Sequence, residues 1–172
     1  MKWIICLSIL AASNCYAAKV EIKNESFDKF NSLLSLELSS RLNDPATGFY
    51  TTNKNGELDG AFHIKADVSG YDKIMDTHYA FKKIVKGEYK AGKKNSLWLY
   101  EIVFDDGVDY FESYTINIKY KFGECLESNF EGIIGHIMPK TKHTFIDKEL
   151  CTPTAIINKA QELWSIEFEK IK

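Results

Sequence analysis

Apolar and polar residues alternate most clearly between Ser96 and Phe122. Every second position after Gly107 forms one mainly apolar set: Val108, Tyr110, Glu112, Tyr114, Ile116, Ile118, Tyr120 and Phe122. The positions between them are mostly polar, and a period of two is typical of a strand with one buried face. A second β-patterned run, SLWLYEIVF, precedes the turn residues Asp105-Asp106-Gly107. The stretch therefore predicts a β-hairpin.

The register of this hairpin decides whether an acidic pair exists. A two-residue turn at Asp106-Gly107 would place Glu101 opposite Glu112 on the apolar face, a candidate general acid and base. A three-residue turn at 105–107 with a bulge turns Glu101 outward instead. That register groups eight other residues on the apolar face: Trp98, Tyr100, Ile102, Phe104, Val108, Tyr110, Tyr114 and Ile116. Burying each is worth roughly 1.5–3 kcal/mol, and two unpaired buried carboxylates would cost several kcal/mol. We predict the three-residue turn and no acidic pair.

Other strands follow from shorter patterns. The segments are, in order: a short strand or a loose arm at Ala18–Lys23, a hairpin of Gly48–Asn53 and Glu57–Val68 broken at Ser69–Asp72, a strand at Thr77–Lys86 with a bulge at Lys82-Lys83, a bulged strand or buried loop at Asn129–Met138, and an edge strand at Lys142–Asp147. The basic segment KGEYKAGKKN, residues 86–95, reads as a solvated loop between strands.

Two helices complete the pattern. Apolar residues recur at helical spacing from Phe27 to Leu42, with Ser26 as a candidate N-cap. Thr152 and Pro153 open a second helix that extends through Ile171. Strands bracketed by helices, without alternation of the two, predict an α+β fold. We expect an antiparallel meander of five to six strands with both helices on one face. Cystatin-like, NTF2-like and helix-grip arrangements all fit this outline.

The first 17 residues predict a cleaved export signal. Lys2 precedes the apolar run WIICLSILAA, and Cys15-Tyr16-Ala17 supplies a small-x-small site. That run is too short for a membrane span, which needs about 20 residues. Acylation of Cys15, as in a lipoprotein, is disfavoured by the preceding Asn14. We therefore expect one domain over residues 18–172, located in the periplasm or secreted, with no transmembrane segment.

The net charge and the cysteine content exclude several classes of function. Removing Lys2 leaves 21 basic against 24 acidic side chains, a net charge of −3, so the composition argues against nucleic acid as a partner. Cys125 and Cys151 are the two cysteines of the mature chain. Without the CxxC spacing of redox or zinc sites, they predict one disulfide. The sequence carries no motif for a cofactor or a metal, because its four histidines lack ligand spacing.

Three functional hypotheses remain. The first is a non-enzymatic interaction protein, such as an inhibitor, an immunity-type protein or an assembly factor, that binds a protein partner through exposed loops. Its candidate loops are 86–95, with Lys86, Lys90, Lys93 and Lys94, and Gly132–Lys140.

The second hypothesis is a carrier of a small apolar ligand, because 13% of residues are aromatic. The candidate cavity residues are Tyr100, Tyr110, Tyr114 and Tyr120. The third is a small hydrolase or lyase that uses His63 or His78 with a nearby acid. The first hypothesis ranks highest, because no catalytic motif is present and aromatic stripes commonly serve as core.

Overall fold

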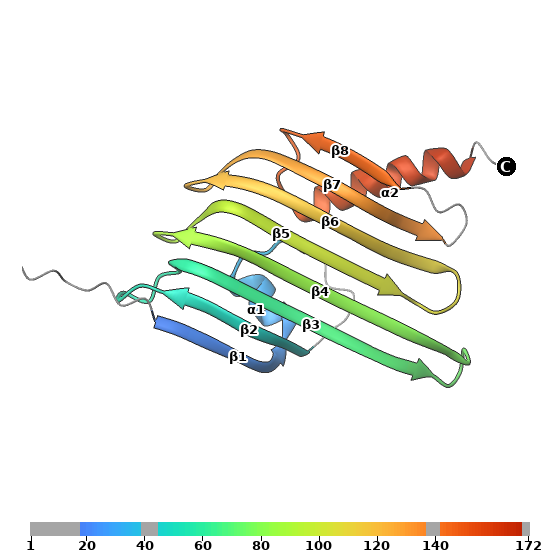
Figure 1. Cartoon of the computed structure of the whole chain (residues 1–172), viewed down its shortest axis with the longest axis horizontal. Coiled ribbons are helices and arrows are strands. Elements are labelled where there is room, and N and C mark those ends of the chain that lie inside the picture. The colour runs from blue at the N-terminus through green and yellow to red at the C-terminus, as the bar shows by residue number, and fades with distance from the viewer. Residues whose placement is uncertain (1–17, 39–44, 137–141, 170–172) are drawn as a thin grey trace, which may run out of the picture.

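The computed structural model describes residues 18–38, 45–136 and 142–169. These residues form one eight-stranded antiparallel sheet in which the strands lie in sequence order (Figure 1). The strands are β1 (Ala18–Ser26), β2 (Pro45–Thr52), β3 (Gly60–Asp72), β4 (Thr77–Lys90), β5 (Lys93–Asp105), β6 (Tyr110–Lys121), β7 (Glu124–His136) and β8 (His143–Asp147). The antiparallel meander is confirmed, but the sheet has eight strands where the pattern predicts five to six.

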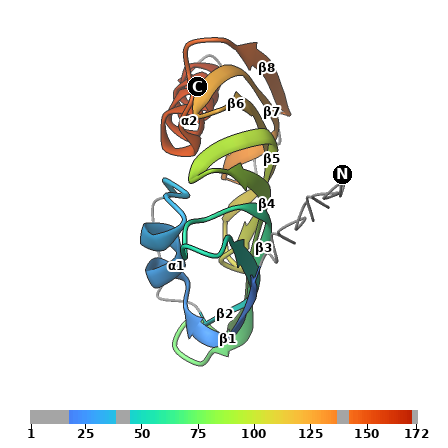
Figure 2. The same cartoon turned by 90° about the vertical axis from the view of Figure 1, so that its left-hand side faces the viewer.

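Two helices, α1 (Phe27–Leu33) and α2 (Pro153–Glu169), lie on the same side of the sheet (Figure 2). We call this side the covered face and the other the open face. α2 begins as predicted, because the hydroxyl of Thr152 accepts a hydrogen bond from the Ala155 N–H at 3.3 Å and Pro153 follows it. Neither helix in the described part of the chain is both long and apolar enough to cross a bilayer.

The first helix is shorter than predicted and ends at Leu33. Beyond it, Leu34, Leu36 and Leu38 are buried while Ser35 and Glu37 are exposed. The last two residues have φ angles of 42° and 59°, so this segment is not helical. The Asn31 side chain holds it in place, donating to the Leu38 carbonyl at 2.8 Å and accepting from the Leu38 N–H at 3.1 Å. The leucines reach the core as expected, but from an irregular segment; residues 39–42 of the predicted helix lie outside the described residues.

The core lies between the covered face and the helices. Trp98 is fully buried at its centre. Its ring centroid lies 4.8 Å from that of Phe62, 5.1 Å from that of Tyr89 and 5.6 Å from that of Tyr120. Aromatic rings at these separations add to the stabilisation from burial itself. Phe62 of β3, Tyr89 of β4, Trp98 of β5 and Tyr120 of β6 therefore form one continuous aromatic layer.

The central hairpin keeps the predicted faces but not the predicted turn. Tyr100 pairs with Ile116 and Phe104 with Glu112. The loop between β5 and β6 is therefore residues 106–109. The Asp106 carboxylate closes that loop by accepting hydrogen bonds from the N–H groups of residues 108, 109 and 110. Val108 consequently lies in the loop and is 48% exposed. Glu101 pairs with Thr115 instead of Glu112, so the acidic pair does not form.

The predicted loop at 86–95 is instead the tip of a second long hairpin. β4 runs to Lys90 and β5 starts at Lys93, leaving Ala91-Gly92 as a two-residue turn. Both turn residues have positive φ, 50° and 73°, as a type I′ turn requires. The register shift in β4 lies between Lys86 and Glu88, not at Lys82-Lys83. β3 likewise continues through Asp72, where the sequence predicts a break.

Cys125 and Cys151 form a disulfide with a Cα–Cα distance of 5.9 Å. The disulfide is the predicted one, and it ties the start of β7 to the segment that enters α2. The glycine-containing stretch after Asn129 belongs to β7 through His136, and β8 pairs with β7 as the edge strand. Residues 1–17, the predicted signal, lie outside the described residues.

Candidate functional site

Exposed apolar side chains gather where β3 turns into β4 and β5 turns into β6. Ile74 is 93% exposed and Met75 59% exposed at the tip of the β3–β4 hairpin. Tyr71 at 47% and Val108 at 48% stand close behind them. Figure 1 shows both turns at the same end of the sheet. We call Tyr71, Ile74, Met75 and Val108 the apolar end.

Local hydrogen bonds fix the shape of the hairpin tip. The Asp72 carboxylate accepts from the N–H groups of Ile74 at 2.8 Å and Met75 at 3.1 Å. The Tyr71 hydroxyl donates to Asp76, which itself adopts a positive φ of 53°. Aspartate is a common turn residue because its side chain caps the backbone in this way. The two apolar side chains at the tip are therefore presented by a defined turn.

The two turns of the apolar end are also tied to each other. The Thr77 hydroxyl donates to the Gly107 carbonyl at 2.5 Å. The backbones approach so closely that a Cβ on Gly107 would lie 1.9 Å from the His78 carbonyl oxygen. Glycine is required there, because it also has a φ of 74°. The close packing holds Val108 in position beside the β3–β4 hairpin.

A hollow of about 460 Å³ adjoins the apolar end. It is lined by Ser69, Gly70, Tyr71, His78, Tyr79, Ala80 and Asp105. The small residues Ser69 and Ala80 pair across β3 and β4, and the ring centroids of Tyr71 and His78 lie 5.0 Å apart. The apolar tip can insert into a recess of another protein, and the neighbouring hollow can accept a side chain from it.

The charge at this end is acidic. The two turns and the strand ends beside them carry Asp72, Asp76, Asp105, Asp106 and Asp109, against one lysine, Lys73. Asp72 and Asp106 also serve as turn caps by accepting backbone N–H groups. The apolar end therefore carries a negative rim.

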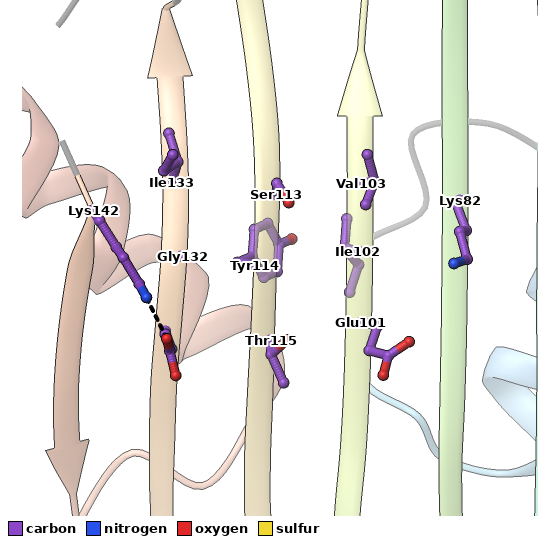
Figure 3. Close-up of a pocket in the computed structure, with 11 residues that line it drawn as sticks. Lys82, Glu101, Ile102, Val103, Ser113, Tyr114, Thr115, Gly132, Ile133 and Lys142 are labelled. Carbon is purple, nitrogen blue, oxygen red and sulfur yellow. Dashed lines mark hydrogen bonds and ion pairs between the residues drawn. The ribbon is translucent and has the colours of Figure 1, made fainter. Parts of the chain in front are cut away.

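A second, shallower feature lies on the open face across β4–β8. It is a trough of about 420 Å³. Its lining combines both charges with hydroxyls and aliphatic groups: Lys82, Glu101, Val103, Ser113, Thr115, Glu131, Ile133 and Lys142, with Ile102, Tyr114 and Gly132 (Figure 3). Lys142 forms an ion pair with Glu131. Mixed charges on the outward side of a strand pattern are typical of a solvated sheet face, so the trough ranks below the apolar end.

The four candidate tyrosines do not share one cavity. Tyr100, Tyr114 and Tyr120 are buried, and Tyr110 is half-buried with its hydroxyl donating to Glu112. The Tyr120 hydroxyl donates to the Cys151 carbonyl at 2.9 Å. Burial raises the pKa of Tyr100 and Tyr120. A cavity of about 130 Å³ on the covered face is lined by Tyr114 alone of the four.

The four candidate lysines lie on β4 and β5, not in a loop. Lys86, Lys90 and Lys93 are exposed. Lys94 is partly buried; its ammonium lies 3.0 Å from Glu37 and 4.9 Å from the Trp98 ring centroid. The structure therefore assigns Lys94 a packing role and leaves the other three on the surface at the end of the sheet opposite the apolar end. Residues 137–140 of the other candidate loop lie outside the described residues.

The histidines lie on different strands. His63 pairs with Lys86, and His78 pairs with Tyr71, so eight residues of β3, roughly 26 Å, separate the two. Burial and the neighbouring lysines lower the pKa of His63, while His143 is buried on β8. Within the described ranges, no three histidine, cysteine or acidic side chains converge to hold a metal ion.

Sequence reasoning missed the apolar end, although a signal exists. Ile74 and Met75 stand in a segment rich in aspartate, DKIMD, where turn residues are expected. An apolar pair at the tip of a turn is solvent-exposed unless another element covers it. No family model, curated protein or solved structure matches the chain, so its function is inferred from this geometry.

Proposed function

We propose that this chain is a non-enzymatic, exported protein that binds a protein partner through the apolar end. The observation that carries the proposal is Ile74, which is 93% exposed at the tip of a long hairpin and flanked by Met75. Contiguous exposed apolar side chains commonly mark interaction sites. Export follows from the predicted signal at residues 1–17.

The apolar end has the composition of an interface core. Burial of Ile74 and Met75 against a partner is worth roughly 1.5–3 kcal/mol each. Methionine adapts its shape to a partner's surface, and the neighbouring hollow of about 460 Å³ can accept a side chain in return. A few such residues usually supply most of the energy of binding.

The negative rim indicates the kind of partner. Complementary charges speed up association and fix orientation, so the five aspartates favour a partner with basic residues around an apolar recess. The same charges disfavour the surface of an anionic membrane, which attracts lysine and arginine.

The alternative of a carrier for an apolar ligand has less support. Ligand pockets usually measure about 300–1,000 Å³ and are mainly apolar. The cavity between sheet and α2 measures about 130 Å³, and charged side chains contribute to its lining. The hydrolase alternative, which needs His63 or His78 beside an acid, is weaker still. Within the described residues, the buried Nε2 of His63 has no hydrogen-bond partner.

The test compares two variants, each of which replaces an exposed isoleucine by serine. I74S/M75S removes the two apolar side chains at the hairpin tip. I146S removes an isoleucine side chain that is 69% exposed on β8. Mature protein of each kind is used as bait in native extract, and the captured partner is then purified for direct binding measurements. We expect I74S/M75S to bind on the order of 100-fold more weakly, while I146S matches the wild type. Equal affinity of wild type and I74S/M75S would refute the proposal.

A further inference from the structure

The strand β1 is the outermost strand at one edge of the sheet, and β8 forms the other edge. β1 pairs with β2 on one side, and Figure 1 shows no other described element along its outer side. Alternate N–H and C=O groups of an edge strand point away from its neighbour, so the strand can pair with another chain. Short length and proline commonly protect an edge. β1 has 9 residues and no proline, so its edge is a candidate interaction surface.

The first half of β1 is regular and alternates in character. Ile22 is buried in the core, and Val20 lies two positions before it on the same, covered face. Lys19 and Glu21 lie on the open face, and their side chains are 54% and 57% exposed. The Lys19 ammonium lies 2.7 Å from the Glu21 carboxylate and 4.5 Å from the Phe49 ring centroid. The open side of this edge therefore carries one positive and one negative group next to each other.

Two copies of β1 complement each other when they pair antiparallel about a two-fold axis through Val20. Lys19 then lies opposite Glu21 of the second copy, and Glu21 lies opposite its Lys19. Opposite charges at directly opposed positions stabilise a pair of strands. On the covered face, the same axis places the half-buried Val20 against Val20 of the second copy. The ion pair within each chain and the two pairs between the chains then form a closed ring of alternating charge.

Other registers of the same pairing are disfavoured. Directly opposed residues must share a face of the sheet, so the two-fold axis has to pass through a residue. An axis through Lys19 or through Glu21 places that residue opposite itself, which brings like charges together. An axis through Ile22 would extend the pairing beyond the regular part of β1. The register with β2 shifts between Ile22 and Glu25, and Asn24 has a φ of 52°, so the backbone there does not present a straight edge.

We propose that two copies of this chain associate through their β1 edges, antiparallel about Val20, and form one continuous sheet. Charge selects the partner, because charged side chains on an edge oppose pairing with a strand that does not match them. A second copy supplies the matching order of charges. An isologous contact of this kind is closed at two chains. The pairing uses no residue of the apolar end, so either proposal can fail without the other.

Sedimentation equilibrium of the chain without the predicted signal, residues 18–172, measures the association. A single pair of edge strands is a small interface, so we expect a dimer with a Kd on the order of 10 μM. K19E and E21K should each weaken the dimer by about tenfold or more, because both charge pairs between the chains change from attraction to repulsion. Both side chains are exposed, so neither variant disturbs the core. A wild type that stays monomeric at about 100 μM, tenfold above the expected Kd, overturns the proposal.

Mixing the two variants tests the register itself. K19E carries two acidic groups at the edge and E21K two basic ones, so an equal mixture should form a heterodimer about as tightly as the wild type dimerises. The charge-swapped variant K19E/E21K should likewise dimerise with itself. K65E and D67K are the matched controls: Lys65 and Asp67 form an ion pair of the same spacing, at 2.7 Å, on β3, which is paired on both sides. Both controls should dimerise like the wild type.

Three results would contradict the β1 pairing. The first is a K19E variant that dimerises as tightly as the wild type, which would place the contact on another surface. The second is a mixture of K19E and E21K that associates as weakly as either variant alone, which would exclude the register about Val20. The third is a loss of the dimer in K65E or D67K as large as that in K19E, which would show an effect of net charge instead of a contact at this edge.

Discussion

The Ala91-Gly92 turn gives the sharpest test of the fold. Ala91 has a φ of 50°, a left-handed conformation that is unfavourable for a residue with a Cβ. Asn-Gly is the preferred pair for such a turn, so the substitution A91N should stabilise the protein. The Ala91 N–H donates to the Asp59 carboxylate at 3.1 Å and the Gly92 N–H donates to the Leu58 carbonyl at 2.9 Å. Neither hydrogen bond involves the changed side chain.

The expected gain in stability follows from the backbone conformation of Ala91. The left-handed conformation costs alanine about 1 kcal/mol, and asparagine relieves about 0.5–1 kcal/mol of that cost. Ala91 is exposed, so no burial is lost. For a chain of this length, 1 kcal/mol corresponds to a change in Tm of about 2–4 °C. A91N should therefore raise Tm by roughly 1–4 °C.

Thermal denaturation followed by circular dichroism measures the effect, with A91V as the control. Valine is β-branched and tolerates positive φ poorly, so A91V should melt below the wild type. If A91N melts below the wild type, or if A91V and A91N melt together, residues 86–95 form an ordinary flexible loop and the two-residue turn is wrong.

Two further predictions concern the disulfide and an ion pair. The double variant C125S/C151S should lose about 3.5 kcal/mol, from a closed loop of 26 residues, and about 10 °C in Tm; a Tm equal to that of the unreduced wild type contradicts this. Asp147 accepts from Lys159 at 2.7 Å and from the N–H groups of Glu149 and Leu150, which lowers its pKa to about 2. Because this folded-state pKa lies below the ordinary value of 3.8, the stabilisation is present above pH 4 and is lost as the pH falls toward 2. The difference in Tm between wild type and D147N should shrink over that range; a constant difference would exclude the Asp147 charge as its source.

The sequence predicts the strands that have one buried face, because burial on one side imposes a period of two. Phe62, Ile64 and Ala66 on β3 and the tyrosines of β6 follow this rule. Lys83 breaks it: the pattern places a lysine outward and so requires a bulge, whereas the structure keeps the register and buries the lysine. A rule based on polarity cannot identify a buried charge that its tertiary neighbours stabilise.

Other differences arise from ambiguous local patterns. In LSLEL, residues 34–38, the leucines fit both the helical spacing of four and the strand spacing of two, and tertiary contacts such as that of Asn31 with Leu38 decide the outcome. The hairpin tip at Ala91 lies in a lysine-rich segment whose composition is typical of a solvated loop. The exposure of Ile74 depends on where β3 and β4 end relative to their neighbours, which is a property of the whole sheet.

The sequential order of the strands has a consequence for how the chain folds. Each strand pairs with its neighbours in the sequence, so most non-local contacts join segments that are close along the chain, and folding of such topologies is comparatively fast. Hairpins can form one after another as the polypeptide is synthesised, before later segments arrive. The disulfide-bonded Cys125 and Cys151 belong to the last third of the sequence. Their oxidation therefore fixes the sheet after its earlier strands have already had time to pair.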